Sequence, residues 1–280
     1  MRHPFHTLLL AVTASATVLA ALAVPVSAAR PANPCLDVVQ RKQLHCPDLI
    51  MKRPFGFQLD PLTRPGHALL RAGNSIDNVG TGPAELFGVR SGARTMKARQ
   101  RIYRKRGGRL GVSTGAQLTF KFVPQRGSYW KFLHAAQFDL YRLDSRGRRV
   151  GRARRGPKVS YCLRDLVHSR PGRARSPRTF VYPACNMSPR TQKVRLGTSV
   201  GWSDVYPPTY PEQWIDVTGL RGCFAYVETV DPRNGIYESN ESNNSSTVVV
   251  RLPFRKGPQR CPTASRRAPD ATSPGSGGYY

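Results

Sequence analysis

The sequence predicts a mostly β fold, an antiparallel β-sandwich with long irregular loops. Twenty-four prolines and 25 glycines are spread along its 280 residues and interrupt any long helical period. Short β-rich segments recur between turn signals such as "VGTGP", "SRGR" and "DPRNG". Many short strands with turns between them are typical of a sandwich rather than of alternating strands and helices.

The expected strands follow from alternation and from β-branched or aromatic content. "AQLTFKFVP" and "AAQFDLYRL" alternate apolar and polar side chains, and three further segments are short and β-rich. The stretch "GSYWKFLHAAQFDLY", residues 127–141, reads as one buried strand segment. In chain order, the other expected strands are 116–124, 135–143, 214–220, 223–230 and 246–253.

The chain divides into three parts. Arg2 and the apolar run 8–26, followed by "VSA", predict an export signal over residues 1–28. Residues 29–262 are expected to form the folded domain, and the Ser/Pro/Gly-rich residues 263–280 a disordered tail. No later stretch is long and apolar enough to span a bilayer, so we expect a secreted or cell-wall-associated protein without a transmembrane segment.

Six cysteines remain after the leader. An even number in an exported chain suggests three disulfides, and proximity in sequence favours Cys35–Cys46 and Cys162–Cys185, which leaves Cys223–Cys261. A metal site is the alternative, but the chain has no C-x-x-C pair to support it.

The formal net charge of +28 restricts the choice of partner, and the leader contributes only Arg2 to it. Dense cationic runs lie at 97–109 and 146–158. Outside a cell, such charge favours anionic wall or surface polymers. We expect no sequence-specific nucleic-acid binding, because the aromatic residues do not interleave with the basic runs. A merely solvated basic face is the alternative.

The segments from about residue 46 to 253 resemble the catalytic domain of lysyl oxidases, closest to bacterial members. The resemblance rests on "CPDLI" (46–50), "FDLYRLDSRGRRV" (138–150), "GPKVSYCLRD" (156–165), "SVGWSDVYPPTYPEQWIDVTGL" (199–220) and "YESNESNNSSTVVVRL" (237–252). It implies a β-sandwich core. The family's activity is copper-dependent oxidation of primary amines to aldehydes, by a quinone that is built from a tyrosine and a lysine of the chain.

By this resemblance, Lys158 in "PKVSYC" and Tyr206, eight residues before the tryptophan of "QWID", are the quinone precursors. The copper ligands of the family are histidines at alternate strand positions, and the matching positions are Gly127, Tyr129 and Lys131. A lysine ammonium repels copper, and a protonated phenol is a poor ligand. His134 is three residues out of register, and a packing role is expected for it. We therefore expect neither copper nor the lysine tyrosylquinone.

The resemblance also implies calcium, held between "PDL" and the polar segment before the last strand. Calcium prefers carboxylate, amide and carbonyl oxygens, whereas a turn with Asx caps is the structural alternative. The expected ligands are Asp48, Leu49 through its carbonyl, Glu238, Asn240, Asn243 and Asn244.

Three functions remain open. The first is a lysyl-oxidase-like protein without copper chemistry that serves as a binding or structural module at the cell surface or wall. The second is a working copper amine oxidase. The third is a sandwich domain that binds acidic polysaccharide.

Overall fold

The structure is a computed structural model that describes residues 30–257 and 260–264. The expected leader, 1–28, and all but two residues of the expected tail, 263–280, lie outside these described residues. Within them the chain is nearly all β, and every strand pair is antiparallel. The mostly β fold class is thus confirmed.

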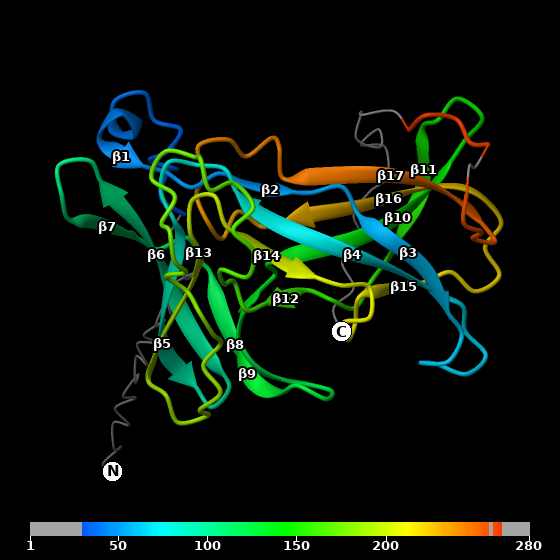
Figure 1. The fold of residues 1–280 in the computed structure, drawn as a ribbon, viewed down its shortest axis with the longest axis horizontal. Helices are drawn as coiled ribbons and strands as arrows, with labels where there is room; N and C mark the ends of the chain where they lie inside the picture. The colour runs from blue at the N-terminus through cyan, green and yellow to red at the C-terminus, as the bar shows by residue number, and fades with distance from the viewer. Residues whose placement is uncertain (1–29, 258–259, 265–280) are drawn as a thin grey trace, which may run out of the picture.

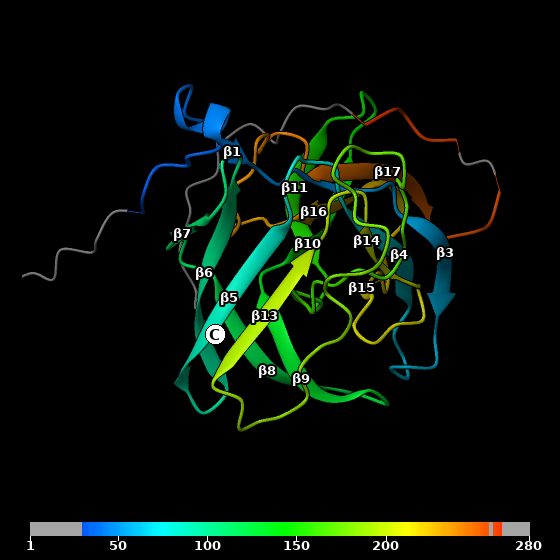
Figure 2. The same cartoon turned by 60° about the vertical axis from the view of Figure 1, so that its left-hand side comes forward.

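The largest sheet of the described chain curves through the order β12-β9-β8-β6-β5-β13, and β1 and β7 also pair with β6. Figure 2 shows β5, β6, β8, β9 and β13 as one curved layer. A short 3-10 helix, η1 (Gln40–Gln43), precedes it. Its strands are β1 (Leu44–His45), β5 (Ala84–Gly92), β6 (Thr95–Arg104), β7 (Arg109–Val112), β8 (Gln117–Val123), β9 (Gly127–Leu133), β12 (Ser160–Tyr161) and β13 (Lys193–Thr198).

Two smaller sheets complete the fold (Figure 1). One has the order β11-β10-β16-β17, and in the other β4 pairs with β14, β15, β2 and β3. Their strands are β2 (Leu49–Met51), β3 (Phe55–Asp60), β4 (Leu69–Asn78), β10 (Ala136–Leu143), β11 (Arg149–Arg155), β14 (Ser203–Tyr206), β15 (Trp214–Asp216), β16 (Gly222–Val230) and β17 (Ser245–Leu252).

The expected strands are found, with one correction. β8, β10, β15, β16 and β17 fall inside or within one residue of their expected segments. The stretch 127–141, however, is not one strand. It forms β9 and then β10, which belong to different sheets, with His134 at a φ of 62° between them. Alternation predicted each strand, but nothing in it marked the left-handed turn.

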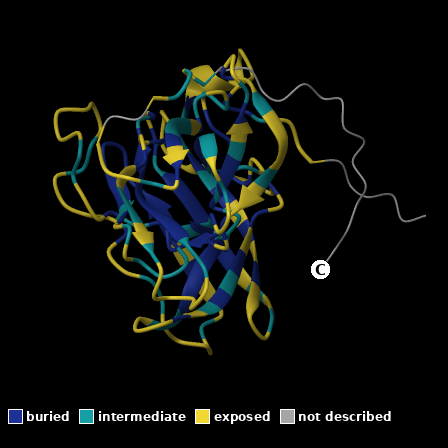
Figure 3. Cartoon of the chain, turned by 90° about the vertical axis from the view of Figure 1, so that its right-hand side faces the viewer, coloured by how far each residue is buried: buried dark blue, intermediate teal, exposed yellow. Residues whose placement is uncertain are grey.

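The three sheets pack around one large apolar cluster, and two smaller clusters lie apart from it. Buried residues fill the interior, and exposed residues follow the loops and sheet edges (Figure 3). Strand β4 is buried along its whole length, which includes the polar side chains of Arg71, Asn74 and Asp77. Strand β11, by contrast, is an arginine-rich edge that is largely exposed.

All six cysteines are paired, and the pairing agrees with the prediction. The disulfides are Cys35–Cys46, Cys162–Cys185 and Cys223–Cys261. The second joins the end of β12 to the long connection that leads to β13. Among the described residues, none of the helical segments has the length and apolar composition that a membrane crossing requires.

Candidate functional site

The site is built around the amine of Lys158, in the connection between β11 and β12. Its side chain is fully buried, and Nζ has no hydrogen-bond partner among the described residues. Three tyrosine rings surround it instead: Nζ lies 4.3 Å from the ring centroids of Tyr161 and Tyr210 and 4.5 Å from that of Tyr206. Burial, with a smaller effect of Lys131, lowers the pKa of Lys158 well below its usual value.

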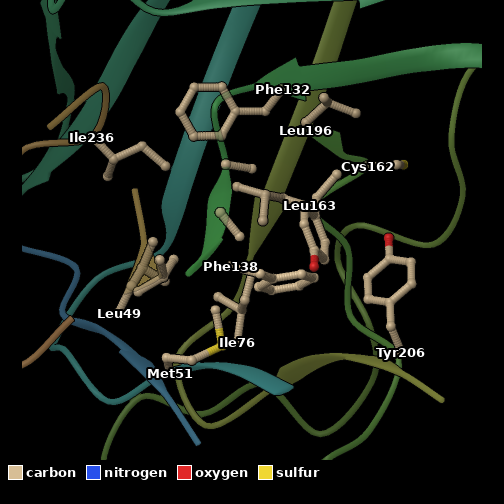
Figure 4. Close-up of a cluster of buried hydrophobic side chains, with 14 of the residues drawn as sticks. Leu49, Met51, Ile76, Phe132, Phe138, Cys162, Leu163, Leu196, Tyr206 and Ile236 are labelled. Atoms are coloured by element: carbon tan, nitrogen blue, oxygen red, sulfur yellow. The ribbon is translucent and has the colours of Figure 1, made fainter. Parts of the chain in front are cut away.

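The tyrosines hold one another in place. Tyr206, at the end of β14, packs edge-to-face against Tyr161 and against Tyr210, each at 4.7 Å and 86°. The Tyr161 hydroxyl accepts a hydrogen bond from the side-chain amide of Asn74 at 2.9 Å. Tyr206 stands beside the apolar core, on the side of Cys162 and away from Leu49 (Figure 4). Burial raises the pKa of Tyr206 well above its usual value, so its phenol stays protonated at neutral pH.

Strand β9 adds a second lysine and a fourth tyrosine. Tyr129 and Lys131 occupy alternate positions, which point to one face of a strand, and both are buried. The Tyr129 hydroxyl is hydrogen-bonded to the Tyr210 hydroxyl. The amine of Lys131 lies 5.3 Å from the Tyr129 ring centroid, and burial lowers its pKa to about 8 although Glu212 opposes the shift.

One buried carboxyl accompanies the two amines. Asp204, on β14, is fully buried, and burial raises its pKa to about 8 against the opposing effects of the nearby Arg164 guanidinium and Lys158 amine. Glu212 lies further out, where its carboxylate accepts from Lys121 at 2.6 Å. Burial thus shifts both amines and the carboxyl toward their uncharged forms, but at pH 7 Asp204 is mostly protonated while Lys131 is still mostly charged.

The structure brings together four of the five residues that the resemblance assigned to this chemistry. Lys158 and Tyr206 are in contact, and Tyr129 and Lys131 join the same cluster. Gly127 does not: its φ is 81°, and a Cβ there would meet Met187. Burial lowers the pKa of the Lys158 amine that lies against the Tyr206 ring, and a lowered pKa favours the unprotonated form in which an amine is a nucleophile.

Sequence reasoning missed Tyr161, Tyr210 and Asp204. A signal existed, because Tyr161 stands three residues after Lys158 and the other two flank Tyr206 in "SDVYPPTY". Nothing local indicated that these segments, one on β12 and one on β14, would meet around a single amine.

The residues present do not fit copper. Copper(II) in proteins favours neutral imidazoles, and this cluster offers phenols and amines. The four histidines that the structure describes lie elsewhere: His67 pairs with Asp216 at 2.6 Å, His168 stacks on Trp202, and His134 and His45 border two separate surface hollows. Within the described residues, no three His, Cys, Asp or Glu side chains gather as a metal-binding group.

The expected calcium ligands partly converge, between the start of β2 and the turn before β17. The Asn243 amide donates to Asp48 at 2.8 Å, and the Asn244 amide donates to Glu238 at 3.0 Å. The backbone N–H of Leu49 also donates to Glu238. The amide oxygens of Asn243 and Asn244 are buried without a partner, as orphaned oxygens at a cation site would be.

Two details of this group differ from the expectation. The side-chain amide oxygen of Asn240 accepts hydrogen bonds from the backbone N–H and the hydroxyl of Ser242, so this side chain caps its own turn. Glu241, which was not expected, accepts from the backbone N–H of Glu238 and has its other oxygen buried without a partner. Burial raises the pKa of Glu238 well above its usual value, and a bound cation would reverse this shift. Carboxylate and amide oxygens are the donor types that calcium prefers, although the acidic side chains of the described residues do not gather here as a group of three.

Comparison with known proteins agrees with this geometry. A family model described as Lysyl oxidase matches residues 112–256, which is just over half of the chain. The match includes Lys158, Tyr206 and the positions of Tyr129 and Lys131, whereas Asp48 lies before it. A search of curated proteins gives no match.

Proposed function

The chain belongs to the lysyl oxidase family, and on that premise we propose that it is an exported member without copper amine oxidase activity. In this proposal the β fold serves as a binding module for anionic polymers at the cell surface or wall. Three disulfides and a net charge of +28 support an extracellular role of this kind.

The buried amine of Lys131 carries the proposal. It occupies a position that the resemblance assigns to a copper ligand, and it is fully buried beside the Lys158 amine. An ammonium there would repel a metal cation, and its side chain fills space that a bound metal would need. With phenols as the other nearby groups, this cluster packs as a solid interior rather than as a metal cage.

A working copper amine oxidase is the second candidate, and one observation favours it. The Lys158 amine lies 4.5 Å from the Tyr206 ring centroid, which is the pair that the family joins into its quinone. If copper were bound, it would supply the redox chemistry for oxidation of the tyrosine ring. The chain's own contribution would be to hold the Lys158 amine, whose pKa burial lowers, against that ring.

Metal analysis and carbonyl labelling of the same preparation separate the two candidates. The secreted full-length chain is incubated with Cu(II), desalted, and measured for copper by mass spectrometry. It is then treated with phenylhydrazine and assayed for peroxide release from alkylamines. We expect substoichiometric copper, no adduct on a Tyr206 peptide, and no peroxide. A quinone absorbance band, or an adduct on that peptide, would establish the oxidase instead.

A restored variant serves as the positive control. Replacement of Tyr129 and Lys131 together by histidine places two imidazoles at alternate positions on β9, and Gly127 is kept because its φ of 81° would strain a side chain. This variant should retain more copper than the parent chain. If the parent chain and the variant bind the same amount of copper, Lys131 does not control copper binding at this position.

We also propose a calcium site formed by Asp48, Glu238, Asn243 and Asn244, to which Glu241 is added here. The Leu49 carbonyl remains in the proposed ligand set, whereas Asn240, which the resemblance also implied, is left out because its side-chain oxygen already accepts from Ser242. Calcium would supply no chemistry. It would tie β2 to the segment before β17 by favouring the charged form of the Glu238 carboxyl, which burial disfavours.

A further inference from the structure

A cationic hollow lies far from the lysine–tyrosine cluster in the chain, where η1 and β1 meet the β6–β7 turn (Figure 1). It has a volume of about 450 Å³. Arg41 and Lys42 from η1, Lys105 from the turn and Arg175 from a loop line it, together with His45. The Cys35–Cys46 disulfide forms part of its wall, and none of its lining residues is acidic.

The four cationic side chains of this hollow are uncompensated. Among the residues that the structure describes, none of them takes part in a salt bridge, whereas Arg71, Arg101 and Arg155 each pair with a buried or half-buried carboxylate. Four positive charges around one concavity raise its potential and attract anions. Arg175 is held at a φ of 70°, a left-handed conformation that is uncommon outside glycine.

His45 presents an unsatisfied nitrogen in the same place. Its Nδ1 is buried and has no hydrogen-bond partner within the described chain. Burial lowers the pKa of His45, and the neighbouring Arg175 and Lys105 lower it further. An orphaned ring nitrogen beside four free cations is the arrangement expected when a ligand atom completes the site.

A second, less polar hollow of about 220 Å³ adjoins the first, and the two share Thr81 and Arg175. Tyr103 and Tyr182 line it with Pro83 and Pro177. Both tyrosine hydroxyls donate to the buried carboxylate of Glu85, at 2.9 and 2.7 Å, so the two rings are fixed. The two hollows together form a groove, cationic at one end and lined by aromatic and proline side chains at the other.

We propose that this groove binds an oxyanion-bearing polysaccharide. Phosphate, sulfate or carboxylate groups would meet Arg41, Lys42, Lys105 and Arg175, and a sugar ring would lie against the apolar end. Single-stranded nucleic acid fits less well. Bases need open aromatic faces to stack on, and Tyr182 is buried, whereas a sugar ring needs only an apolar surface such as Pro83, Pro177 and Val181 provide.

The proposal assigns a site and a ligand class to the binding half of the proposed function, on which it rests. The test measures binding of a fluorescent sulfated oligosaccharide to the full chain by anisotropy, with uncharged dextran, inorganic polyphosphate and a DNA oligonucleotide as competitors. The double variant Lys105→Ala/Arg175→Ala removes two groove cations. The matched control, Arg146→Ala/Arg152→Ala, removes two exposed cations near and on β11.

We expect the groove variant to lose affinity by about tenfold and the control by less than about twofold, since only groove cations act together on one ligand. Polyphosphate should compete partially and dextran not at all. Equal losses in the two variants would mean that binding depends on diffuse surface charge. That result would contradict the groove as the binding site but not the binding function itself. Stronger competition by DNA than by the sulfated glycan would overturn the ligand class. If the parent chain binds none of the anionic probes, the binding half of the proposed function fails as well.

Discussion

At the scale of single residues, the unusual feature is that two lysine amines are buried without hydrogen-bond partners. A buried charge is expensive unless it is paired, and the usual response is a pKa shift toward the neutral form. Lys131 and Lys158 both show that shift. Contact with tyrosine rings compensates only in part, because the attraction of a ring for an amine depends on the charge that burial removes.

Replacement of Lys131 by methionine should stabilise the protein. The methionine side chain fills similar volume and leaves no amine to desolvate, so we expect the free energy of unfolding to rise by about 1–3 kcal/mol. Urea denaturation at pH 7 measures the change. Lys121→Met is the control, since Lys121 is partly exposed and paired with Glu212, and it should not stabilise. A loss of stability in the Lys131 variant would show that its amine has a partner that matters.

Asp204 should make stability fall as pH rises. Its carboxyl has a pKa of about 8 in the folded chain against 3.8 as its ordinary value, so between these values the folded state holds a proton that the unfolded state has lost. The free energy of unfolding then decreases by about 1.4 kcal/mol per pH unit from pH 4 toward pH 8. Asp204→Asn should reduce the measured slope by that amount but not abolish it, because Asp231, whose pKa burial raises to about 7, adds a slope of the same sign. Urea denaturation at pH 5 and 7.5 measures the difference. An unchanged slope would place its origin in another group.

At the scale of elements, alternation and turn residues were enough to predict the strands but not their partners. β8 and β10 were expected from sequence because apolar and polar residues alternate along them, and β16 and β17 because they are short and β-rich. The corner at His134 was missed because a left-handed residue between two apolar runs has no signal in that alternation. For the same reason, the meeting of Tyr161 with Tyr206 depends on how the sheets pack, which local pattern does not encode. The domain limits 29–262 stay a prediction.

The calcium group links elements distant in sequence, and its removal should loosen that link. We expect millimolar calcium to raise the melting temperature above its value in chelator, because a ligand that binds only the folded state adds about 2.7 kcal/mol at 100 times its Kd. Glu238→Gln should abolish the increase. Asn240→Ala should preserve most of it, since that side chain caps its own turn. Equal melting curves with calcium and chelator would reduce the group to a polar turn.

At the scale of the whole molecule, charge is far out of balance. Lysine and arginine number 44 against 16 aspartates and glutamates, and like charges repel one another most strongly in the compact state. The apolar core and the three disulfides therefore stabilise the fold, while repulsion among the excess positive charges destabilises it.

Added salt should therefore stabilise the protein. Raising sodium chloride from 10 to 300 mM shortens the screening length from about 30 Å to about 6 Å, which weakens long-range repulsion more than close ion pairs. We expect a higher midpoint of thermal unfolding at the higher salt, measured by circular dichroism. A lower midpoint would indicate that the exposed ion pairs, such as Arg148 with Asp144, contribute more than the repulsion costs.

Strand β11 is the outermost strand of its sheet and carries a row of exposed arginines. An open edge has unpaired backbone groups that can recruit a strand from another molecule, and positive charge along it keeps copies apart. A long polyanion would cancel that protection. The protein should then precipitate with long anionic polymers at charge equivalence and stay in solution with short ones. Turbidity measures this loss of charge repulsion between copies. On a densely anionic wall, the same loss of repulsion would favour deposition of the protein as a layer over its release into the medium.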